Sequence, residues 1–508
     1  MMKKPERAIL AIDEGTSGTR AALVFADGTV SEPVYAALSI YNPKHGVVEQ
    51  DAEQILNQTI NVCRKQIASA REANIEIVAM AQTTQRATAV LWDLKSGRPL
   101  VPAIVWQDGR YATELEVFGT RWNKKLTQNT GRPIAGRSHY YWVMQQIKNN
   151  ENVRKAFDEK RLAFGTIDTW LLWNLAEGNP LYTTPTNATS LGAYKLSGLE
   201  YYNDWLDELG FPSELLAELK QDADDFGFTR EDLLSIKVPI RASCGDQQAS
   251  VIGLGCREVG DAMCIHGTGS FVELVAGSRK PQNIGAVDAS FVMTGWRRNN
   301  KSHYVVETYT ATTGSALNWI CKELQWFANP EEISALASTV ASSKSMIFVP
   351  SLTGLRLPHI ETKARASLNG ISVAHTRADL AYGILEGIAH SVNDCVKATE
   401  LVAENAVKQL NAGGGVSSSS TLLQLQADLA GVPIRRIPGF GRASLRGTAF
   451  LAGAEGILWS DLKEAQNSLP EGEYFIPKIS DDERQMRISH WNACVGNEMK
   501  HANQSYYS

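Results

Sequence analysis

DEGTSGTR at residues 13–20 separates two short apolar runs, residues 8–12 and 21–25. Two such runs around a cluster of glycine, serine and threonine predict a β-hairpin, whose tip offers hydroxyls and backbone N–H groups with little side-chain bulk. Such a tip suits a phosphate. The acidic residue at its start, Asp13, suits a hydrated Mg²⁺, which takes one or two carboxylates together with phosphate oxygens. A plain glycine turn is the competing interpretation of this stretch.

The same layout returns near the middle of the chain. Residues 262–265 are apolar, residues 271–275 are apolar apart from Glu273, and HGTGS at residues 266–270 lies between the two runs. A chain of 508 residues exceeds what one hydrophobic core usually supports. The recurrence therefore predicts two domains of related design, each giving one hairpin to a shared cleft, although two similar hairpins can also arise by chance.

The composition is that of an ordinary globular protein, with 44% hydrophobic and 21% charged residues. A net charge of −5 gives no electrostatic reason to expect nucleic acid or an anionic membrane as partner. The first apolar run, residues 8–12, is too short for a signal peptide core, and no apolar stretch approaches the ~20 residues of a membrane span. The seven cysteines are scattered without a Cys-x-x-Cys pair, so we expect neither a disulfide framework nor a zinc site, and a cytoplasmic location.

Alternating strand and helix patterns follow the first hairpin. Residues 52–70 have the apolar spacing of an amphipathic helix, and residues 75–82 read as a buried strand followed by TTQR at residues 83–86. This alternation predicts an α/β domain, in which ligands collect at the carboxyl ends of strands. Gln85 and Arg86 therefore stand where a substrate could lie.

The next segments continue this domain. Residues 90–93 and 103–108 predict a further pair of strands that ends on the cluster Trp106-Gln107-Asp108. Residues 111–235 are richer in helix-like and loop-like sequence, with residues 164–175 as an apolar helix.

A run of three glycines, residues 413–415, precedes a predicted helix over residues 421–430. Glycines ahead of a helix N-terminus let a ligand lie flat against the backbone. A flexible linker is the alternative, which the apolar helix makes less favoured. We also predict a core-facing helix over residues 379–402, and a small-residue helix over residues 447–458 that packs beneath the glycine loop.

Seven segments, taken in order along essentially the whole chain, resemble the FGGY carbohydrate kinases and, within them, the glycerol kinases. They are DEGT (13–16), TQR (84–86), AIVWQ (103–107), FGTIDTWL (164–171), GDQQA (245–249), GTGSF (267–271) and residues 370–389. The resemblance implies an α/β fold of two actin-like, RNase H-type domains that face each other across a cleft. Residues 1–250 would bind the polyol or sugar and carry the first phosphate hairpin, and residues 251–508 would bind the nucleotide.

By the same resemblance, ATP and Mg²⁺ are the cofactors. Asp13 would hold Mg²⁺ through water. The nucleotide contacts would come from both hairpins, the start of a helix and the glycine loop: Thr16, Ser17, Arg20, Gly267, Thr268, Gly314, Asn318, Gly414 and Gly415.

Asp246 matches the catalytic base of this family. The role is physically reasonable, because phosphoryl transfer asks the protein mainly for positioning and charge neutralisation, plus one carboxylate that accepts the hydroxyl proton. Arg86, Trp106, Gln247 and Phe271 match the substrate pocket, where hydrogen-bonding groups face hydroxyls and aromatic rings face carbon-bound hydrogens.

Three departures from the glycerol kinases stand out. Ala87 replaces an acidic residue that follows the Gln-Arg pair, so an acceptor for one substrate hydroxyl is missing. Residues 135–141 align only loosely, so the tyrosine expected there has no unambiguous counterpart, and the expected lysine is missing. Ser419 replaces an asparagine of the adenosine loop. The first two changes put the substrate in question and leave the reaction intact.

The sequence therefore predicts an enzyme that phosphorylates a primary hydroxyl of a small polyol or sugar, with glycerol as the first candidate. A four- or five-carbon polyol or ketose is the alternative substrate, since Ala87 leaves space. An actin-like regulator that hydrolyses or senses nucleotide is the alternative of another class, and a degenerate kinase homologue is a further rival. We expect no nucleic acid or membrane partner, and a homo-oligomer stays open.

Overall fold

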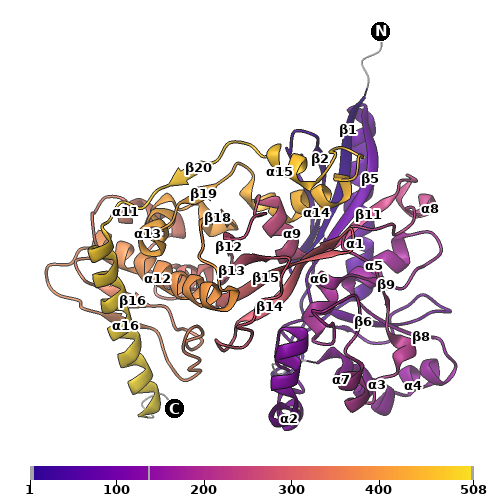
Figure 1. The fold of residues 1–508 in the computed structure, drawn as a ribbon, viewed down its shortest axis with the longest axis horizontal. Helices are drawn as coiled ribbons and strands as arrows, with labels where there is room; N and C mark the ends of the chain where they lie inside the picture. The colour runs from indigo at the N-terminus through magenta and orange to yellow at the C-terminus, as the bar shows by residue number, and fades with distance from the viewer. Residues whose placement is uncertain (1–4, 135–137, 505–508) are drawn as a thin grey trace.

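The computed structural model describes residues 5–134 and 138–504, and two large sheets organise it (Figure 1). The N-terminal sheet has the order β11 (Ile240–Gly245), β5 (Ile75–Thr84), β1 (Glu6–Glu14), β2 (Gly18–Phe25), β3 (Val34–Ala37). The C-terminal sheet has the order β14 (Phe291–Arg298), β15 (Lys301–Thr310), β13 (Ser270–Gly277), β12 (Asp261–His266), β18 (Gln409–Gly413), β19 (Ile434–Arg436), β20 (Glu473–Phe475).

Both sheets are built on one plan. In each, the first two strands form an antiparallel hairpin, β1–β2 or β12–β13, and a third strand, β3 or β15, extends the hairpin antiparallel. Two strands then join the other side of the first strand in parallel, β5 and β11 in one sheet and β18 and β19 in the other. The C-terminal sheet adds β14 and β20 at its edges. The predicted pair of related domains is confirmed.

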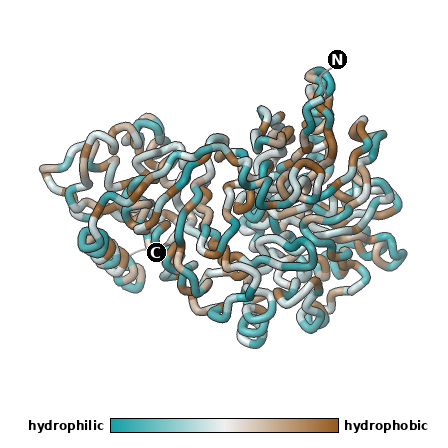
Figure 2. Tube along the Cα trace, turned by 45° about the horizontal axis from the view of Figure 1, so that its top comes forward, coloured by the Kyte–Doolittle hydropathy of each residue, from teal (hydrophilic) through white to brown (hydrophobic). Residues whose placement is uncertain are grey.

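The two faces of the N-terminal sheet bury different partners, because side chains alternate along a strand. Ala8, Leu10 and Ile12 of β1 pack with α1 (Ala52–Glu72) and α5 (Ile167–Leu175). Ile9 and Ala11 face the opposite way, into a cluster that includes α9 (Asp246–Gly253) and α14 (Ala443–Gly453). Figure 2 shows hydrophobic stretches along the strands near the N-terminus.

Helices α9 and α14 join the two halves of the molecule. Their cluster also contains Met263, Val275 and Val305 of the C-terminal sheet, so one core is continuous between the domains. The helices cross very closely, since a Cβ on Gly447 would lie 1.7 Å from the carbonyl oxygen of Ala249. Glycine is therefore required at this crossing.

The remaining elements surround these sheets. The other helices are α2 (Ala112–Thr130), α3 (His139–Asn149), α4 (Glu151–Asp158), α6 (Pro185–Ala188), α7 (Asn203–Glu208), α8 (Glu231–Leu234), α10 (Gly314–Lys322), α11 (Pro330–Ala337), α12 (Arg377–Ala403), α13 (Ser420–Ala430), α15 (Leu462–Asn467) and α16 (Asp481–Asn503). A small sheet has the order β4 (Glu49–Gln50), β7 (Ala103–Ile104), β6 (Ala89–Asp93), β8 (Leu162–Thr166). Two-stranded sheets pair β9 (Tyr182–Thr183) with β10 (Glu218–Leu219) and β16 (Ile347–Val349) with β17 (Ser367–Asn369).

Three predicted elements differ from the structure. The single helix expected over residues 164–175 is a strand followed by α5, because residues 162–166 pair antiparallel with β6. The strand expected over residues 103–108 is only β7, which pairs with β6 through one residue. The helix expected over residues 447–458 is α14, which packs on α9 and the N-terminal sheet instead of beneath the glycine loop.

No helix in the described ranges is long and apolar enough to cross a membrane. All seven cysteines are free thiols, and six of them are buried.

Candidate active site

The β1–β2 hairpin presents an oriented carboxylate. Asp13 and Arg20 are register partners, and the Arg20 guanidinium donates a hydrogen bond to Asp13 Oδ2. Ser444 of α14 donates a second hydrogen bond, of 2.8 Å, to the same oxygen. The tip between the strands is closed by the N–H of Gly15, which donates to the carbonyl of Gly18 at 3.0 Å. Asp13 is almost completely buried, and these hydrogen bonds hold its carboxylate in one orientation.

Two hydrogen bonds to Thr16 hold the tip of this hairpin in place. Trp106 Nε1 donates a hydrogen bond of 2.9 Å to Thr16 Oγ1, and Gln50 Nε2 donates one of 2.7 Å to the Thr16 carbonyl. Gln85 donates to Gln50 Oε1 at 2.9 Å and accepts from Thr88 Oγ1 at 3.1 Å. The predicted substrate residue Gln85 is fully buried in this network, so its side chain supports the tip of the hairpin.

Arg86 lies between the two domains. Its Nη2 donates a hydrogen bond of 2.6 Å to Glu307 Oε2 on β15, and its Nε lies 3.5 Å from Asp246 Oδ1 on α9. Its Nη1 lies 3.6 Å from the sulfur of Met293. Burial lowers the pKa of Arg86, but Glu307 and Asp246 more than offset this and leave it above its ordinary value, so the side chain stays charged.

Asp246 has the properties of a base that works near neutral pH. Burial raises the pKa of its carboxyl to about 6, while the charge of Arg86 opposes that shift and the charge of Asp13 adds to it. The side chain is 28% exposed, so a substrate can reach it. A carboxylate of this kind is ionised at neutral pH and can accept a proton from a hydroxyl.

The neighbours of Asp246 supply further recognition groups. The N–H of Gln247 donates to Asp246 Oδ1 at 2.8 Å, whereas Gln247 Oε1 is buried and no described residue donates to it. Phe271 stacks on Tyr309, with ring centres 5.5 Å apart, at the start of β13. A buried acceptor without a partner costs free energy, which a ligand hydroxyl would recover.

Ala87 is half-buried directly after Arg86 and has a φ of 52°, in the left-handed region. It packs against the cluster formed around the small sheet and α3. In the loosely aligned segment of residues 135–141, residues 135–137 lie outside the described residues. Tyr140 packs in the core against Phe164 and Phe211. Tyr141 packs against Tyr111.

The second hairpin adjoins the start of α10 and the glycine loop. The N–H of Gly314 donates to the carbonyl of Gly267 at 3.0 Å, and those of Thr313 and Ser315 donate to Thr268. Gly414 has a φ of 82°, and a Cβ there would lie 2.4 Å from the His266 carbonyl oxygen. The structure therefore brings together the predicted residues Gly267, Thr268, Gly314 and Gly414.

The other predicted nucleotide residues are on open surfaces. Ser17, Asn318 and Gly415 are exposed, and nothing lies within 4 Å of a Cβ placed on Gly415. Ser419, which departs from the expected asparagine, is the N-cap of α13 and accepts a hydrogen bond of 2.8 Å from Ser334. It is therefore engaged in the helix start.

Asp13 fits a cation that brings most of its own ligands. Within the described ranges no group of three or more His, Cys, Asp or Glu side chains could hold a metal ion. Mg²⁺ needs no such group, because it keeps several waters and takes one or two carboxylates plus substrate phosphates. The contacts that orient Asp13 from Arg20 and Ser444 both fall on Oδ2, so Oδ1 is the oxygen that would accept from a metal-bound water.

Three residues of this site were not predicted from the sequence. Ser444 orients Asp13, Glu307 holds Arg86, and Glu273 lies opposite Glu307. Ser444 lies 431 positions from Asp13 and Glu307 lies 221 from Arg86, while Glu273 meets Glu307 only through the pairing of β13 with β15, so no local pattern marks these residues. The only available signal was the unusual acidic residue at an alternating apolar position of a buried strand, as at Glu273.

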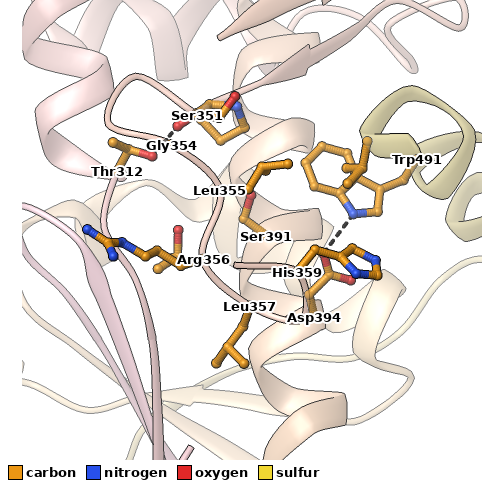
Figure 3. Close-up of a pocket in the computed structure, with 13 residues that line it drawn as sticks. Thr312, Ser351, Gly354, Leu355, Arg356, Leu357, His359, Ser391, Asp394 and Trp491 are labelled. Carbon is orange, nitrogen blue, oxygen red and sulfur yellow. Dashed lines mark hydrogen bonds between the residues drawn. The ribbon is translucent and has the colours of Figure 1, made fainter. Parts of the chain in front are cut away.

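A separate hollow lies away from these residues, between the loop after β16, α12 and α16 (Figure 3). Asp394 lies on its wall and accepts a hydrogen bond of 2.8 Å from Trp491 Nε1. Burial raises the pKa of Asp394 to about 7. None of the predicted site residues lines this hollow.

Two α/β domains of one strand plan, each beginning with a glycine-containing hairpin and joined through α9 and α14, define the actin-like class of two-domain proteins. Within this class, residues 8–253 match the N-terminal domain of the FGGY family of carbohydrate kinases, and residues 262–455 match its C-terminal domain. The chain belongs to this family. It is therefore a phosphotransferase of the polyol and sugar kinase type, and its family implies ATP as the phosphoryl donor.

Curated relatives agree with this assignment over nearly the full length. The chain is 34% identical to the glycerol kinase of Rippkaea orientalis over 503 residues, covering 97% of this chain and 98% of the relative. It is 32% identical to the glycerol kinase of Thermus brockianus, covering 96% and 97%. None of the comparisons favours a regulator without kinase activity.

Solved structures show the same fold. A glycerol kinase of Plasmodium falciparum with ADP superposes with a TM-score of 0.91 at 25% identity, covering 98% of this chain and 99% of that chain. A ligand-bound xylulose kinase of Lactobacillus acidophilus superposes with a TM-score of 0.83 at 21% identity, covering 99% of both chains. The predicted two-domain, actin-like α/β fold is confirmed.

Proposed function

We propose that this enzyme transfers the γ-phosphoryl group of ATP to a primary hydroxyl of a small polyol, with glycerol as the first candidate. The observation that carries this proposal is Asp246: a reachable carboxylate with a pKa of about 6, beside Arg86 and within the field of Asp13. The curated relatives named glycerol kinases support glycerol.

The side chains divide the work as follows. Asp246 accepts the proton of the attacking hydroxyl. Arg86 and Gln247 hold the neighbouring hydroxyls: their N–H groups donate hydrogen bonds to these hydroxyls, and the unpaired Gln247 Oε1 accepts one. Trp106 and Phe271 form the apolar walls, and Trp106 also ties that wall to the phosphate hairpin through Thr16. Substrate and hairpin are thereby positioned by a common contact.

The nucleotide is proposed to lie between the hairpins. Thr16, Ser17 and Arg20 would contact its phosphates from one domain, and Gly267 and Thr268 from the other. Gly314, Asn318, Gly414 and Gly415 would line the rest of the nucleotide. Mg²⁺, held through water by Asp13, would neutralise phosphate charge when bound.

A four- or five-carbon polyol or ketose is the second candidate substrate. Ala87 is the observation that favours this second candidate. This half-buried alanine supplies no acceptor for a glycerol hydroxyl at a place where glycerol kinases have an acidic residue. Xylulose kinases are among the structures with the same fold, which is compatible with a longer substrate.

The domain boundary is proposed near residue 250, with residues 1–250 bearing the polyol site and residues 251–508 the nucleotide site. Helix α9 spans this boundary, and α14 packs back against the N-terminal sheet. The boundary therefore separates the two ligand sites and not two separate hydrophobic cores.

The free, mostly buried thiols support a reducing, cytoplasmic setting.

The test is ATP turnover over a panel of glycerol, erythritol, xylitol, D-xylulose, L-ribulose and gluconate. We expect turnover with at least one three- to five-carbon substrate, and a product that carries phosphate on a primary hydroxyl. ATP hydrolysis at the same rate with and without every compound would contradict the proposal and favour the regulator.

A further inference from the structure

Two glutamates face each other in the C-terminal sheet at the edge of the candidate site. Glu273 on β13 and Glu307 on β15 are antiparallel register partners. Glu273 is completely buried and Glu307 is 5% exposed. Directly opposite residues in such a pair have Cβ atoms about 5 Å apart, close enough for their carboxyl groups to meet.

The two glutamates have different neighbours on the two sides along their strands. One step toward the cleft, the next residues on the same face are Phe271 and Tyr309, whose rings stack. One step away from it, Val275 packs in the core that joins the domains. The two carboxyl groups therefore lie between an aromatic wall of the pocket and a dry core.

The charges at this place do not balance if every carboxyl is ionised. Arg86 is the cation, and Asp246 and Glu307 both contact it at 3.5 and 2.6 Å. Glu273 adds a third carboxyl group, and no described residue donates a hydrogen bond to either of its oxygens. An ionised carboxylate buried without a donor is strongly disfavoured, and like charges directly opposite each other add to the cost.

A proton on Glu273 resolves both problems. Burial, followed by the charge of Glu307, raises the pKa of Glu273 well above its ordinary value. As a neutral acid it becomes a donor, and the carboxylate of Glu307 stands directly opposite it as an acceptor. Two carboxyl groups that share a site in this way commonly hold one proton between them.

We propose that Glu273 is a positioning residue: as a neutral acid it donates a hydrogen bond to Glu307, and the pair acts as one anchored anion that fixes Arg86 beside Asp246. The proposal rests on the proposed function, because Arg86 matters to turnover only if it holds the polyol. It extends that function by adding a residue which touches neither substrate nor nucleotide.

The pair also joins the two domains at the substrate. Arg86 follows β5 of the N-terminal sheet, whereas both glutamates belong to the C-terminal sheet. The orientation of a substrate-binding guanidinium thus depends on an anchor in the opposite domain. An anchored Glu307 leaves Arg86 one bonding arrangement, and a Glu307 free to rotate leaves it several.

Kinetics of Glu273→Leu and Glu273→Gln test this with the substrate that the panel identifies. Leucine removes the donor, so we expect KM for the polyol to rise about tenfold, the size of one lost hydrogen bond, while KM for ATP stays the same. Glutamine restores an N–H donor without charge, and it should recover most of the loss. Val275→Ala, on the same face of the same strand, is the matched control: it should lower thermal stability and leave both KM values as in the parent.

A rise in polyol KM for the leucine variant alone supports the proposal. Equal polyol KM values in the parent and both variants would overturn it, and so would equal rises in Glu273→Leu and Val275→Ala, which would show a merely structural effect.

Infrared spectroscopy tests the proton without turnover. The difference spectrum between the parent and Glu273→Gln at neutral pH should contain the C=O stretch of one protonated carboxyl group. Its absence overturns the proposal even if the enzyme phosphorylates a polyol. If the C=O band is present but the protein turns over no compound of the panel, the protonated glutamate pair is supported and the proposed function is refuted.

Discussion

Ser444 donates a hydrogen bond of 2.8 Å to Asp13 although 431 positions separate the two residues. The contact places the second half of the chain directly on the carboxylate proposed to hold metal-bound water. Replacing Ser444 by Ala should therefore loosen Asp13 and lower kcat about tenfold, in line with one lost hydrogen bond to a charged group. The measurement is kcat at saturating ATP and polyol over a series of Mg²⁺ concentrations, and the Mg²⁺ requirement should rise.

Thr448→Val provides the control for this variant. Thr448 lies one turn later on α14 and donates to the Gln82 carbonyl at 2.8 Å instead of to Asp13. Its loss should cost stability and leave kcat unchanged. If both variants lose activity equally, the effect of Ser444 is one of packing and not of orientation.

Asp246→Asn keeps the size of the side chain and removes the base. General base catalysis contributes about 10²–10⁴-fold, so kcat should fall by that factor while the Kd of the polyol changes little. Binding is measured by calorimetry in the absence of ATP. Near-normal turnover by this variant would mean that another group accepts the proton.

The pH dependence of turnover follows from the pKa of Asp246. Because burial raises this pKa to about 6 and the base works in its ionised form, kcat/KM should be level at high pH, turn near pH 6, and fall about tenfold per unit below it. Each sample is returned to pH 8 and assayed again, which separates titration from unfolding. A level profile down to pH 5 would contradict an essential base with this pKa.

The fold was largely predictable because its signals are local. The hairpin at residues 13–20 and its recurrence at residues 266–270 show the alternation of apolar runs and small residues that a backbone turn requires. The helices α1 and α12 follow from apolar spacing, and both appear within two residues of the expected bounds. Residues 164–166 were misassigned to a helix because their strand depends on pairing with β6, which the apolar run itself does not encode.

The site was predictable only in part. Residues on the hairpins and strand ends carry recognisable patterns, and the structure places Arg86 beside Asp246 as they imply. Ser444 and Glu307 act through contacts between distant segments, and such contacts follow from the packing of α14 and β15. Gln85 was predicted to face the substrate because it follows a strand end. In the structure its side chain instead bonds Gln50 and supports the hairpin.

Ala87 gives the prediction that separates the two candidate substrates. A pocket that hydrogen-bonds a hydroxyl discriminates by leaving buried polar groups unpaired with the wrong ligand, whereas an alanine imposes no such penalty and frees volume. Glycerol should then bind loosely, and kcat/KM for some four- or five-carbon polyol or ketose should exceed that for glycerol. Ala87→Glu should narrow or reverse this preference.

Ala87→Gln is the matched variant, because it fills the same space without a charge. The backbone strain of the left-handed conformation at this position is common to both variants and cancels between them. If volume alone decides, both variants shift the preference equally; if a carboxylate acceptor is needed, only Ala87→Glu improves glycerol. The quantity is kcat/KM for glycerol, erythritol, xylitol and pentuloses on all three proteins. A parent enzyme that prefers glycerol tenfold or more over every longer substrate, about 1.4 kcal/mol, would show that the hydroxyl acceptor is supplied from elsewhere in the pocket.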